Sequence, residues 1–413
     1  MNPDLLTVKL EKLTYGGDAL GRLSDGRAVF VPFGLPAETV SIRILEEKRG
    51  HVRAELVEVL EASPERITPK CRHFGVCGGC HYQHLSYPAQ LIAKTEILCD
   101  QLMRIGKLES PPVKPMVASS RLWNYRNHIQ FHLTRDGKLG YIFPFPVSGE
   151  GQGVRAISEC HLPEPPLNLL WPRLEFDPGL GLERISLRLG LDDETMLVLE
   201  SPETPELELE TDLSVVHLTN NDTVVMAGDD HLTMRVNDRL FHVSAASFFQ
   251  VNTEMAGKMV EHLLAQLPVS PATTLLDVYC GVGLFSAFFA PRVGRLIGIE
   301  SSPSACEDFA VNLDEFENVE LYEAPAEDVL PALDVKPDIV ILDPPRAGLE
   351  KRALDALLAL GPAKIAYVSC DPSTLARDAA RLIAGGYRLV QVTPFDLFPQ
   401  TFHIESISIF EKG

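Results

Sequence analysis

From residue 247 onward, short apolar runs alternate with amphipathic segments, and this alternation constrains the fold more than any other feature of the sequence. The apolar runs are rich in Val, Ile and Leu, which is typical of strands buried on both faces of a parallel sheet. The expected strands are 273–281, 295–300, 319–324, 337–345, 364–370, 387–399 and 405–413. The expected helices are 253–267, 283–291, 303–316, 350–360 and 373–386. Regular β/α alternation predicts a doubly wound, Rossmann-like α/β sheet, whose last strands form an antiparallel edge.

The residues before this region predict two β-rich units. Residues 5–60 alternate polar and apolar positions between Gly and Pro turns, which indicates a small all-β unit of about five strands. After a linker, short strand-like runs return between about 121 and 245. An amphipathic helix is expected at 87–108, and it could pack on the C-terminal unit. The predicted domains are 1–62, 63–245 and 246–413.

Composition restricts the location and the partners of the chain. No apolar run approaches the ~20 residues of a membrane helix, and the N-terminus lacks an export signal, so we expect a cytoplasmic protein without a membrane partner. The eight cysteines are then expected to bind metal, to react or to be buried. The net charge of −20 argues against a nucleic-acid partner. Residues 63–135, however, hold ten bases and four acids, so a basic face remains possible.

Acidic residues and a glycine turn mark the ligand-binding end of the predicted sheet. Gly281 and Gly283 follow the first strand and would let a ligand approach the backbone. Ser286 replaces the third glycine of a dinucleotide-binding turn, so a ligand without pyrophosphate is favoured. Glu300 ends the next strand, where a carboxylate could accept two ribose hydroxyls, and Asp343 ends the fourth. Each feature also occurs in ordinary β/α turns, but together they indicate S-adenosylmethionine.

Four cysteines have spacings that suit a metal centre. Cys71, Cys77 and Cys80 form a C-x5-C-x2-C pattern, and Cys160 is the candidate for the fourth ligand. Four thiolates suit either zinc or an iron–sulfur cluster, and spacing alone does not separate the two.

Five motifs resemble, in order, those of the RNA uridine-C5 methyltransferases. They are "FFQVN" (248–252), "LDVYCGVG" (276–283), "LDPPRAGL" (342–349), "YVSCDPSTLARD" (367–378) and "HIES" (403–406). The likeness covers nearly the whole chain. The β-rich N-terminus resembles the TRAM domain of this family, an OB-like RNA-binding module. The resemblance implies a class I enzyme that uses S-adenosylmethionine as methyl donor.

The resemblance also assigns the reacting residues. Cys370 would add to C6 of uracil and so make C5 nucleophilic, and Glu405 would remove the C5 proton. The turn from a strand into a helix N-terminus is expected to stabilise the Cys370 thiolate. The alternative for Cys370 is a small buried residue. The alternative for Glu405, which is expected in mid-strand, is a solvated or ion-paired acid.

The resemblance also implies which residues of this chain contact the cofactor. Gln250, Tyr279, Glu300 and Asp343 match family contacts to the cofactor, and Gly281 belongs to the same turn. Leu284 and Ala324 stand where many members have Asn, so those two contacts differ here. The family places a [4Fe–4S] cluster on the cysteine pattern, which favours iron and sulfide over zinc. Because methyl transfer moves no electrons, the cluster is expected to support structure.

The expected substrate is a uridine of structured RNA, and the expected enzyme is an RNA (uracil-C5)-methyltransferase that acts as a monomer. The cluster cysteines favour 23S ribosomal RNA, with transfer RNA as the alternative. Arg121, Trp123, Tyr125 and Asn127 mix basic, aromatic and amide groups and are either RNA contacts or a plain strand pair. Two rival functions are an amine-directed methyltransferase and a non-catalytic iron–sulfur RNA-binding factor. Arg346 after Asp-Pro-Pro disfavours the first, because those enzymes carry an aromatic residue there.

Overall fold

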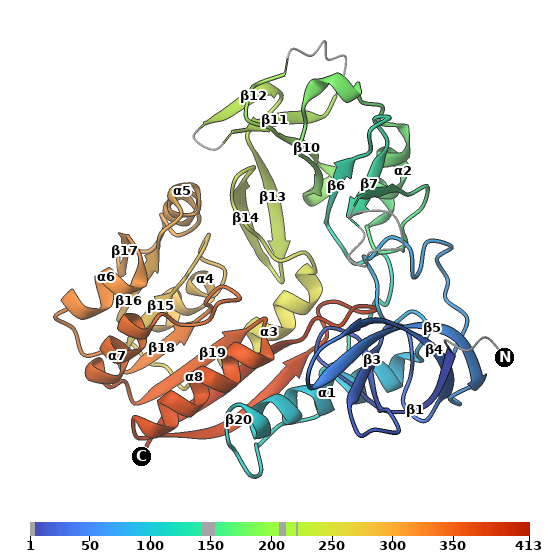
Figure 1. The fold of residues 1–413 in the computed structure, drawn as a ribbon. Coiled ribbons are helices and arrows are strands. Elements are labelled where there is room, and N and C mark those ends of the chain that lie inside the picture. Colours follow the sequence, from blue (N-terminus) through green and yellow to red (C-terminus); the bar gives the residue numbers. More distant parts are fainter. Residues whose placement is uncertain (1–4, 143–152, 206–211, 220–221) are drawn as a thin grey trace.

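The computed structural model describes residues 5–142, 153–205, 212–219 and 222–413. Within these residues the chain forms a closed barrel, two seven-stranded sheets and a two-stranded hairpin (Figure 1). None of the described helices is long and apolar enough to cross a membrane.

The N-terminal barrel has five strands, as expected from the period-two pattern. They are β1 (Leu5–Leu13), β2 (Ala19–Arg22), β3 (Ala28–Val31), β4 (Thr39–Glu47) and β5 (His51–Glu61). Their order is β1-β2-β3-β5-β4, and β4 closes the barrel against β1. Alternate residues such as Val29 and Val31 are fully buried, because successive side chains of a strand point to opposite faces.

The central region begins with α1 (Tyr87–Arg104), which ends four residues before the expected boundary. Gly106 follows this end in close packing, since a Cβ there would lie 2.6 Å from the carbonyl oxygen of Leu102 and 3.1 Å from that of Ala376. Leu98 and Leu102 of α1 share a core cluster with Leu375 and Ala379 of the C-terminal region. Figure 1 shows α1 beside the barrel and α8.

A seven-stranded sheet forms the rest of the central region, with the order β12-β11-β10-β9-β6-β7-β8. Its elements are β6 (His128–Leu133), β7 (Leu139–Ile142), β8 (Val154–Ala156), α2 (Pro165–Leu170), β9 (Arg184–Leu189), β10 (Thr195–Glu200), β11 (Ser214–Leu218) and β12 (Thr223–Ala227). The hairpin β13 (His231–Val236) and β14 (Arg239–Ser244) follows and packs through Met234 and Phe241 on the core of the C-terminal sheet.

The C-terminal sheet has the order β17-β16-β15-β18-β19-β21-β20, and it is parallel from β17 to β19. Its strands are β15 (Thr274–Val278), β16 (Arg295–Glu300), β17 (Val319–Glu323), β18 (Ile339–Leu342), β19 (Lys364–Ser369), β20 (Tyr387–Phe395) and β21 (Glu405–Lys412). The helices are α3 (Thr253–Gln266), α4 (Ser286–Phe289), α5 (Pro303–Asn312), α6 (Ala326–Val329), α7 (Lys351–Leu360) and α8 (Pro372–Ala384). β21 is antiparallel to both β19 and β20, so the predicted doubly wound sheet with an antiparallel edge is confirmed.

Candidate active site

The candidate site lies at the carboxyl edge of the parallel strands. Tyr279 follows β15, Glu300 ends β16, Asp343 follows β18 and Cys370 follows β19. Glu405 begins β21, and because β21 is antiparallel, its first residues lie at this same edge. The register pairs Ser369 with Ser406, which places Cys370 and Glu405 on neighbouring strands. The strand begins at Glu405, in agreement with its expected bounds of 405–413, so this residue stands at the strand end and not in mid-strand.

Glu300 organises the turn on the cofactor side of this edge. Its Oε2 accepts the N–H of Gly281 at 3.0 Å, and its Oε1 accepts the N–H groups of Ser301 at 2.7 Å and Ser302 at 2.8 Å. These bonds fix the carboxylate at the mouth of the glycine turn. Each carboxylate oxygen has two lone-pair positions, and these three bonds use three of the four, so Glu300 could accept one further hydroxyl donor from a ligand.

The two glycines of this turn have different roles. Gly281 has φ +53°, and a Cβ built there would meet nothing within 4 Å, so this position faces open space. Gly283 has φ +89°, and its Cβ would lie 2.4 Å from Leu313 Cδ1. The expectation that both glycines admit a ligand was therefore wrong for Gly283, which makes room for the chain beyond α5. Tyr279 has φ +64°, an uncommon conformation for a residue with a Cβ.

The remaining cofactor candidate, Gln250, lies in the segment between β14 and α3. Asn127 donates through Nδ2 to the Gln250 carbonyl oxygen at 3.0 Å, and the Asn127 N–H bonds the Val251 carbonyl oxygen. Tyr125 is fully buried, and its hydroxyl donates to the Pro399 carbonyl oxygen at 3.0 Å. Tyr125 and Asn127 thus connect site segments, and their burial disfavours RNA contact, one of the two alternatives, for these residues. The half-buried Trp123 has Lys70 over its ring at 5.2 Å.

Three ionisable side chains at this edge of the sheet have raised pKa values, and each contributes to the shift of another or is shifted by one. Burial, followed by Asp277 and Glu300, raises the pKa of Asp343 to about 7. Burial and then Asp343 raise the pKa of Glu405 well above its ordinary value, against an opposing effect of Arg346. Burial, then Glu405 and Asp343, raise the pKa of Cys370 to about 12, and Arg346 again opposes the shift.

The helix after Cys370 does not lower its pKa as expected. The Asp371 side chain caps α8 by accepting the N–H groups of Ser373 at 2.8 Å and Thr374 at 3.0 Å. These first-turn donors therefore serve Asp371, and the helix N-terminus is neutralised by a carboxylate rather than by a thiolate. A pKa raised to about 12 favours the thiol form of Cys370 near neutral pH.

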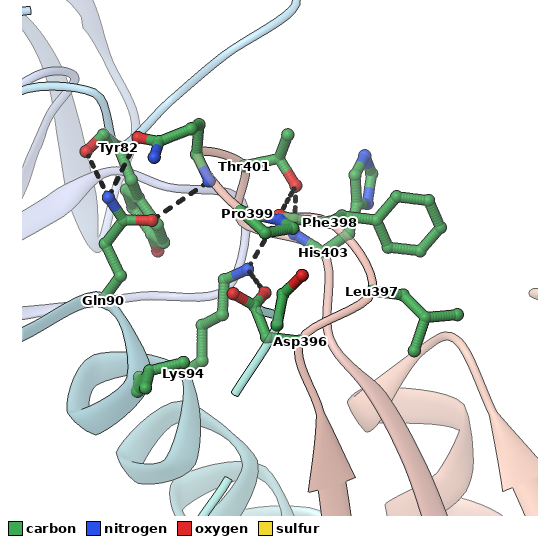
Figure 2. Close-up of polar contacts among 12 residues, drawn as sticks. Tyr82, Gln90, Lys94, Asp396, Leu397, Phe398, Pro399, Thr401 and His403 are labelled. Atoms are coloured by element: carbon green, nitrogen blue, oxygen red, sulfur yellow. Dashed lines mark hydrogen bonds and ion pairs between the residues drawn. The ribbon is translucent and has the colours of Figure 1, made fainter. Parts of the chain in front are cut away.

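A buried polar network fixes residues 396–404, the segment that leads into Glu405. Lys94 of α1 donates to Asp396 Oδ1 at 2.6 Å and to the Phe398 carbonyl oxygen at 3.0 Å, as Figure 2 shows. Gln90 donates to Gln400 Oε1 at 3.0 Å and accepts the Gln400 N–H at 3.0 Å. The sequence reasoning missed Lys94 and Asp396. A signal existed for Asp396, which is a charge within the apolar stretch 394–399.

The four cluster cysteines line one cavity, together with Tyr141 and Arg126. The N–H of His73 points to Cys71 Sγ at 3.4 Å, and that of Gly79 points to Cys77 Sγ at 3.5 Å. Burial is the main cause that raises the pKa of Cys160 to about 11, and the Cys77 thiol adds to it. Four thiols around one cavity, with backbone N–H groups directed at two of them, are compatible with a metal centre of either zinc or iron and sulfide. Cys71 also lies near Glu159 and His161, with ligand atoms within 4.8 Å.

The strand order, the glycine turn and the acid after the second strand are those of the class I methyltransferases. Comparisons with known proteins identify the family. The family model described as tRNA (Uracil-5-)-methyltransferase matches residues 207–412, and the TRAM domain model matches residues 4–57.

Relatives resemble the chain over nearly its whole length. An RNA methyltransferase of Chlorobaculum tepidum is 33% identical, with 95% of this chain and 93% of the relative covered. One of Thermotoga maritima is 32% identical, with 98% of this chain and 99% of the relative covered. The crystal structure of Pyrococcus abyssi tRNA (uracil-54, C5)-methyltransferase with S-adenosyl-L-homocysteine is 25% identical and has a TM-score of 0.74; 98% of this chain and 100% of that chain are covered. This chain therefore belongs to the RNA uracil-5 methyltransferase family.

Proposed function

We propose that the protein transfers a methyl group from S-adenosylmethionine to C5 of a uridine in structured RNA. The placement of Cys370 and Glu405 on neighbouring strands, with Asp343 at the same edge, supports this proposal. A thiol beside a buried carboxyl group is the pair that C5 methylation requires, because a nucleophile must add and a base must remove a proton.

In the proposed reaction the Cys370 thiol loses its proton to solvent, and Sγ forms a bond to C6 of the ring as the π bond between C5 and C6 breaks. C5 gains carbanion character and takes the methyl group, which bound S-adenosylmethionine would supply as an electrophile, leaving S-adenosylhomocysteine. Glu405 then accepts the C5 proton, and the bond between Sγ and C6 breaks. This sequence restores the thiolate and leaves 5-methyluridine. Glu405 acts only when it is deprotonated, so its raised pKa makes it a stronger base once ionised.

Five residues are proposed to hold the methyl donor. They are Gln250, Tyr279, Gly281, Glu300 and Asp343. The open space at Gly281 and the fixed Glu300 carboxylate support a nucleoside ligand at this turn. Neither departure from the family pattern supplies a polar side chain. Leu284 is buried, and the Ala324 N–H bonds the Glu300 carbonyl oxygen.

We further propose that Cys71, Cys77, Cys80 and Cys160 hold a [4Fe–4S] cluster. Their convergence on one cavity supports the proposal, and its role would be to stabilise the segment that leads from the barrel into α1. Protein purified without oxygen should contain iron and sulfide in stoichiometric amounts. Cys80→Ser should lose both, and Cys99→Ser, on α1, should keep them. Stoichiometric zinc without iron would refute the assignment.

For the substrate we propose 23S ribosomal RNA, with a monomeric cytoplasmic enzyme built from the segments 1–62, 63–245 and 246–413. Transfer RNA is the second candidate, and the Pyrococcus abyssi structure favours it, since that protein is a transfer RNA methyltransferase. Mapping 5-methyluridine in total RNA from cells with and without the protein separates the two. The modified position would disappear from one RNA class only.

A trapping experiment tests the chemistry itself. RNA that carries 5-fluorouridine should form a stable covalent complex with the protein, because fluorine cannot leave as a proton. Cys370→Ala should abolish the complex. Cys280→Ala is the matched control, because Cys280 is a buried cysteine in the turn after β15, at the same edge of the sheet, and the complex should persist. Retained methylation in Cys370→Ala would refute the mechanism and favour an amine-directed reaction.

A further inference from the structure

The N-terminal barrel contacts the turn that carries Cys370. Tyr15 lies between β1 and β2, and its hydroxyl donates to Asp371 Oδ2 at 2.9 Å, across 356 residues of sequence. The Tyr15 ring also meets the Phe402 ring edge-on, with the centroids 5.7 Å apart. Phe402 precedes His403, and the centroids of these two rings are 4.4 Å apart. One barrel residue therefore touches both segments that lead to Cys370 and Glu405.

Asp371 is held at both oxygens. Its Oδ1 accepts the two N–H groups at the start of α8, and its Oδ2 accepts the Tyr15 hydroxyl. The Ser369 hydroxyl accepts the Asp371 N–H at 3.2 Å, so the backbone of the turn is also fixed. These bonds hold the Asp371 carboxylate, next to Cys370, in one orientation. The barrel supplies the bond to Oδ2.

The Asp371 carboxylate opposes ionisation of its neighbour. The pKa of Cys370 is raised by burial, by Glu405 of β21, by Asp343 and by Asp371, whereas Arg346, in the turn after β18, lowers it. Burial and then Asp371 raise the pKa of Tyr15, so its hydroxyl stays protonated and remains a donor. A hydrogen bond to a carboxylate disperses its negative charge and weakens its repulsion of a nearby thiolate.

We propose that Tyr15 is a positioning residue for Cys370, because it fixes the Asp371 carboxylate and disperses its charge, so that the cysteine is fully reactive only with the barrel docked. The inference rests on the proposed nucleophilic role of Cys370. It gives the barrel a function in the chemical step, in addition to binding RNA. It also gives a role to the hydrogen bond between Tyr15 and Asp371, which lies at the interface between the barrel and the sheet.

Two substitutions test the proposal with little change of shape. Tyr15→Phe keeps the ring against Phe402 and removes the donor. Asp371→Asn keeps an oxygen that can cap α8 and removes the charge. The measured quantity is the rate at which iodoacetamide alkylates Cys370 in the full-length protein, followed by mass spectrometry of the peptide. Alkylation needs neither RNA nor methyl donor, so this readout is independent of the proposed methylation.

Tyr15→Phe should slow alkylation of Cys370 about threefold at fixed pH, which corresponds to about half a pKa unit. Asp371→Asn should accelerate it by a similar factor. In the double variant the rate should equal that of Asp371→Asn, because Tyr15 acts through Asp371. Cys99 lies on α1, which contacts the barrel through Asp100, so an unchanged Cys99 rate shows that the barrel is still docked.

An unchanged Cys370 rate in Tyr15→Phe would overturn the proposal. An equal slowing by Tyr15→Phe with and without Asp371→Asn would also overturn it, because the ring would then act independently of the carboxylate. In methylation assays Tyr15→Phe should lower kcat about threefold near neutral pH and leave KM unchanged. The loss should shrink as the pH rises. Full methylation by Cys370→Ala, with the alkylation results as expected, would instead refute the proposed reaction alone.

Discussion

Replacing Lys94 by Met should be among the most destabilising single changes in the chain. Both Lys94 and Asp396 have 0% of their side chains exposed, and their charged atoms lie 2.6 Å apart. Burial lowers the pKa of Lys94, and Asp396 opposes this shift, so the ammonium group depends on its partner. Removing one charge leaves the other buried without compensation, which typically costs about 3 to 5 kcal/mol. We therefore expect the melting temperature to fall by roughly 10 °C.

The chain offers a matched control for this prediction. Lys12 of β1 forms an ion pair with Asp100 of α1, the helix that also carries Lys94, and the two charged atoms lie 2.7 Å apart. The Lys12 and Asp100 side chains, however, are 42% and 29% exposed. Lys12→Met should cost less than about 1 kcal/mol. The double variant Lys94→Met with Asp396→Leu should recover most of the lost stability, because it removes both charges. Thermal unfolding followed by circular dichroism measures all three. Equal losses in Lys94→Met and Lys12→Met would refute the reasoning.

Three further predictions concern the site. Glu405→Gln should trap the methylated RNA as a covalent complex, visible on denaturing gels, and slow its release by about 10²-fold or more; prompt release would exclude Glu405 as the base. The pKa of Asp343 is raised to about 7 in the folded protein, so its protonated carboxyl group contributes to the free energy of unfolding. This contribution is fully present below about pH 4 and is lost as the pH rises through 7. Unfolding free energies of Asp343→Asn should therefore fall less over that range than those of the wild type, and parallel curves would contradict this. Gly281→Ala should raise KM for S-adenosylmethionine. Gly283→Ala should leave this KM unchanged and should cost about 1 to 3 kcal/mol of stability through the contact of its Cβ with Leu313. The reverse pattern would contradict the open space found at Gly281 and the close packing found at Gly283.

Local sequence patterns predicted the C-terminal sheet because the burial of each strand determines which residue types it contains. Strands β15 and β18 are buried on both faces, so they appear in the sequence as continuous apolar runs. Acids at the carboxyl ends of β16 and β18 interrupt such runs, and Glu300 and Asp343 could therefore be placed at one edge from the sequence. The barrel followed from period-two alternation for the same reason.

Contacts between distant segments could not be predicted in this way. Lys94 and Asp396 are 302 residues apart, and Tyr15 and Asp371 are 356 apart. Nothing in the local composition of either partner specifies the other. Tyr125 shows a related limit, because its polar neighbours left RNA contact and a structural role both open, whereas its hydroxyl donates to the Pro399 carbonyl oxygen in the interior. A polar group is compatible with burial wherever a distant segment supplies its partner.

The net charge of −20 gave the most misleading argument, since the chain belongs to a family of RNA methyltransferases. Phosphate groups respond to the local potential over about 10 Å, so the total charge of a protein does not decide whether it binds RNA. Residues 164–230 hold 16 acids and three bases. Figure 1 shows β11 and β12 of this segment far from the barrel and α8. Cys370, Asp343 and the exposed Arg346 lie at the other sheet, beside the barrel that Tyr15 docks. β11 and β12 of the acidic segment are thus separated in space from the sheet edge that carries Cys370.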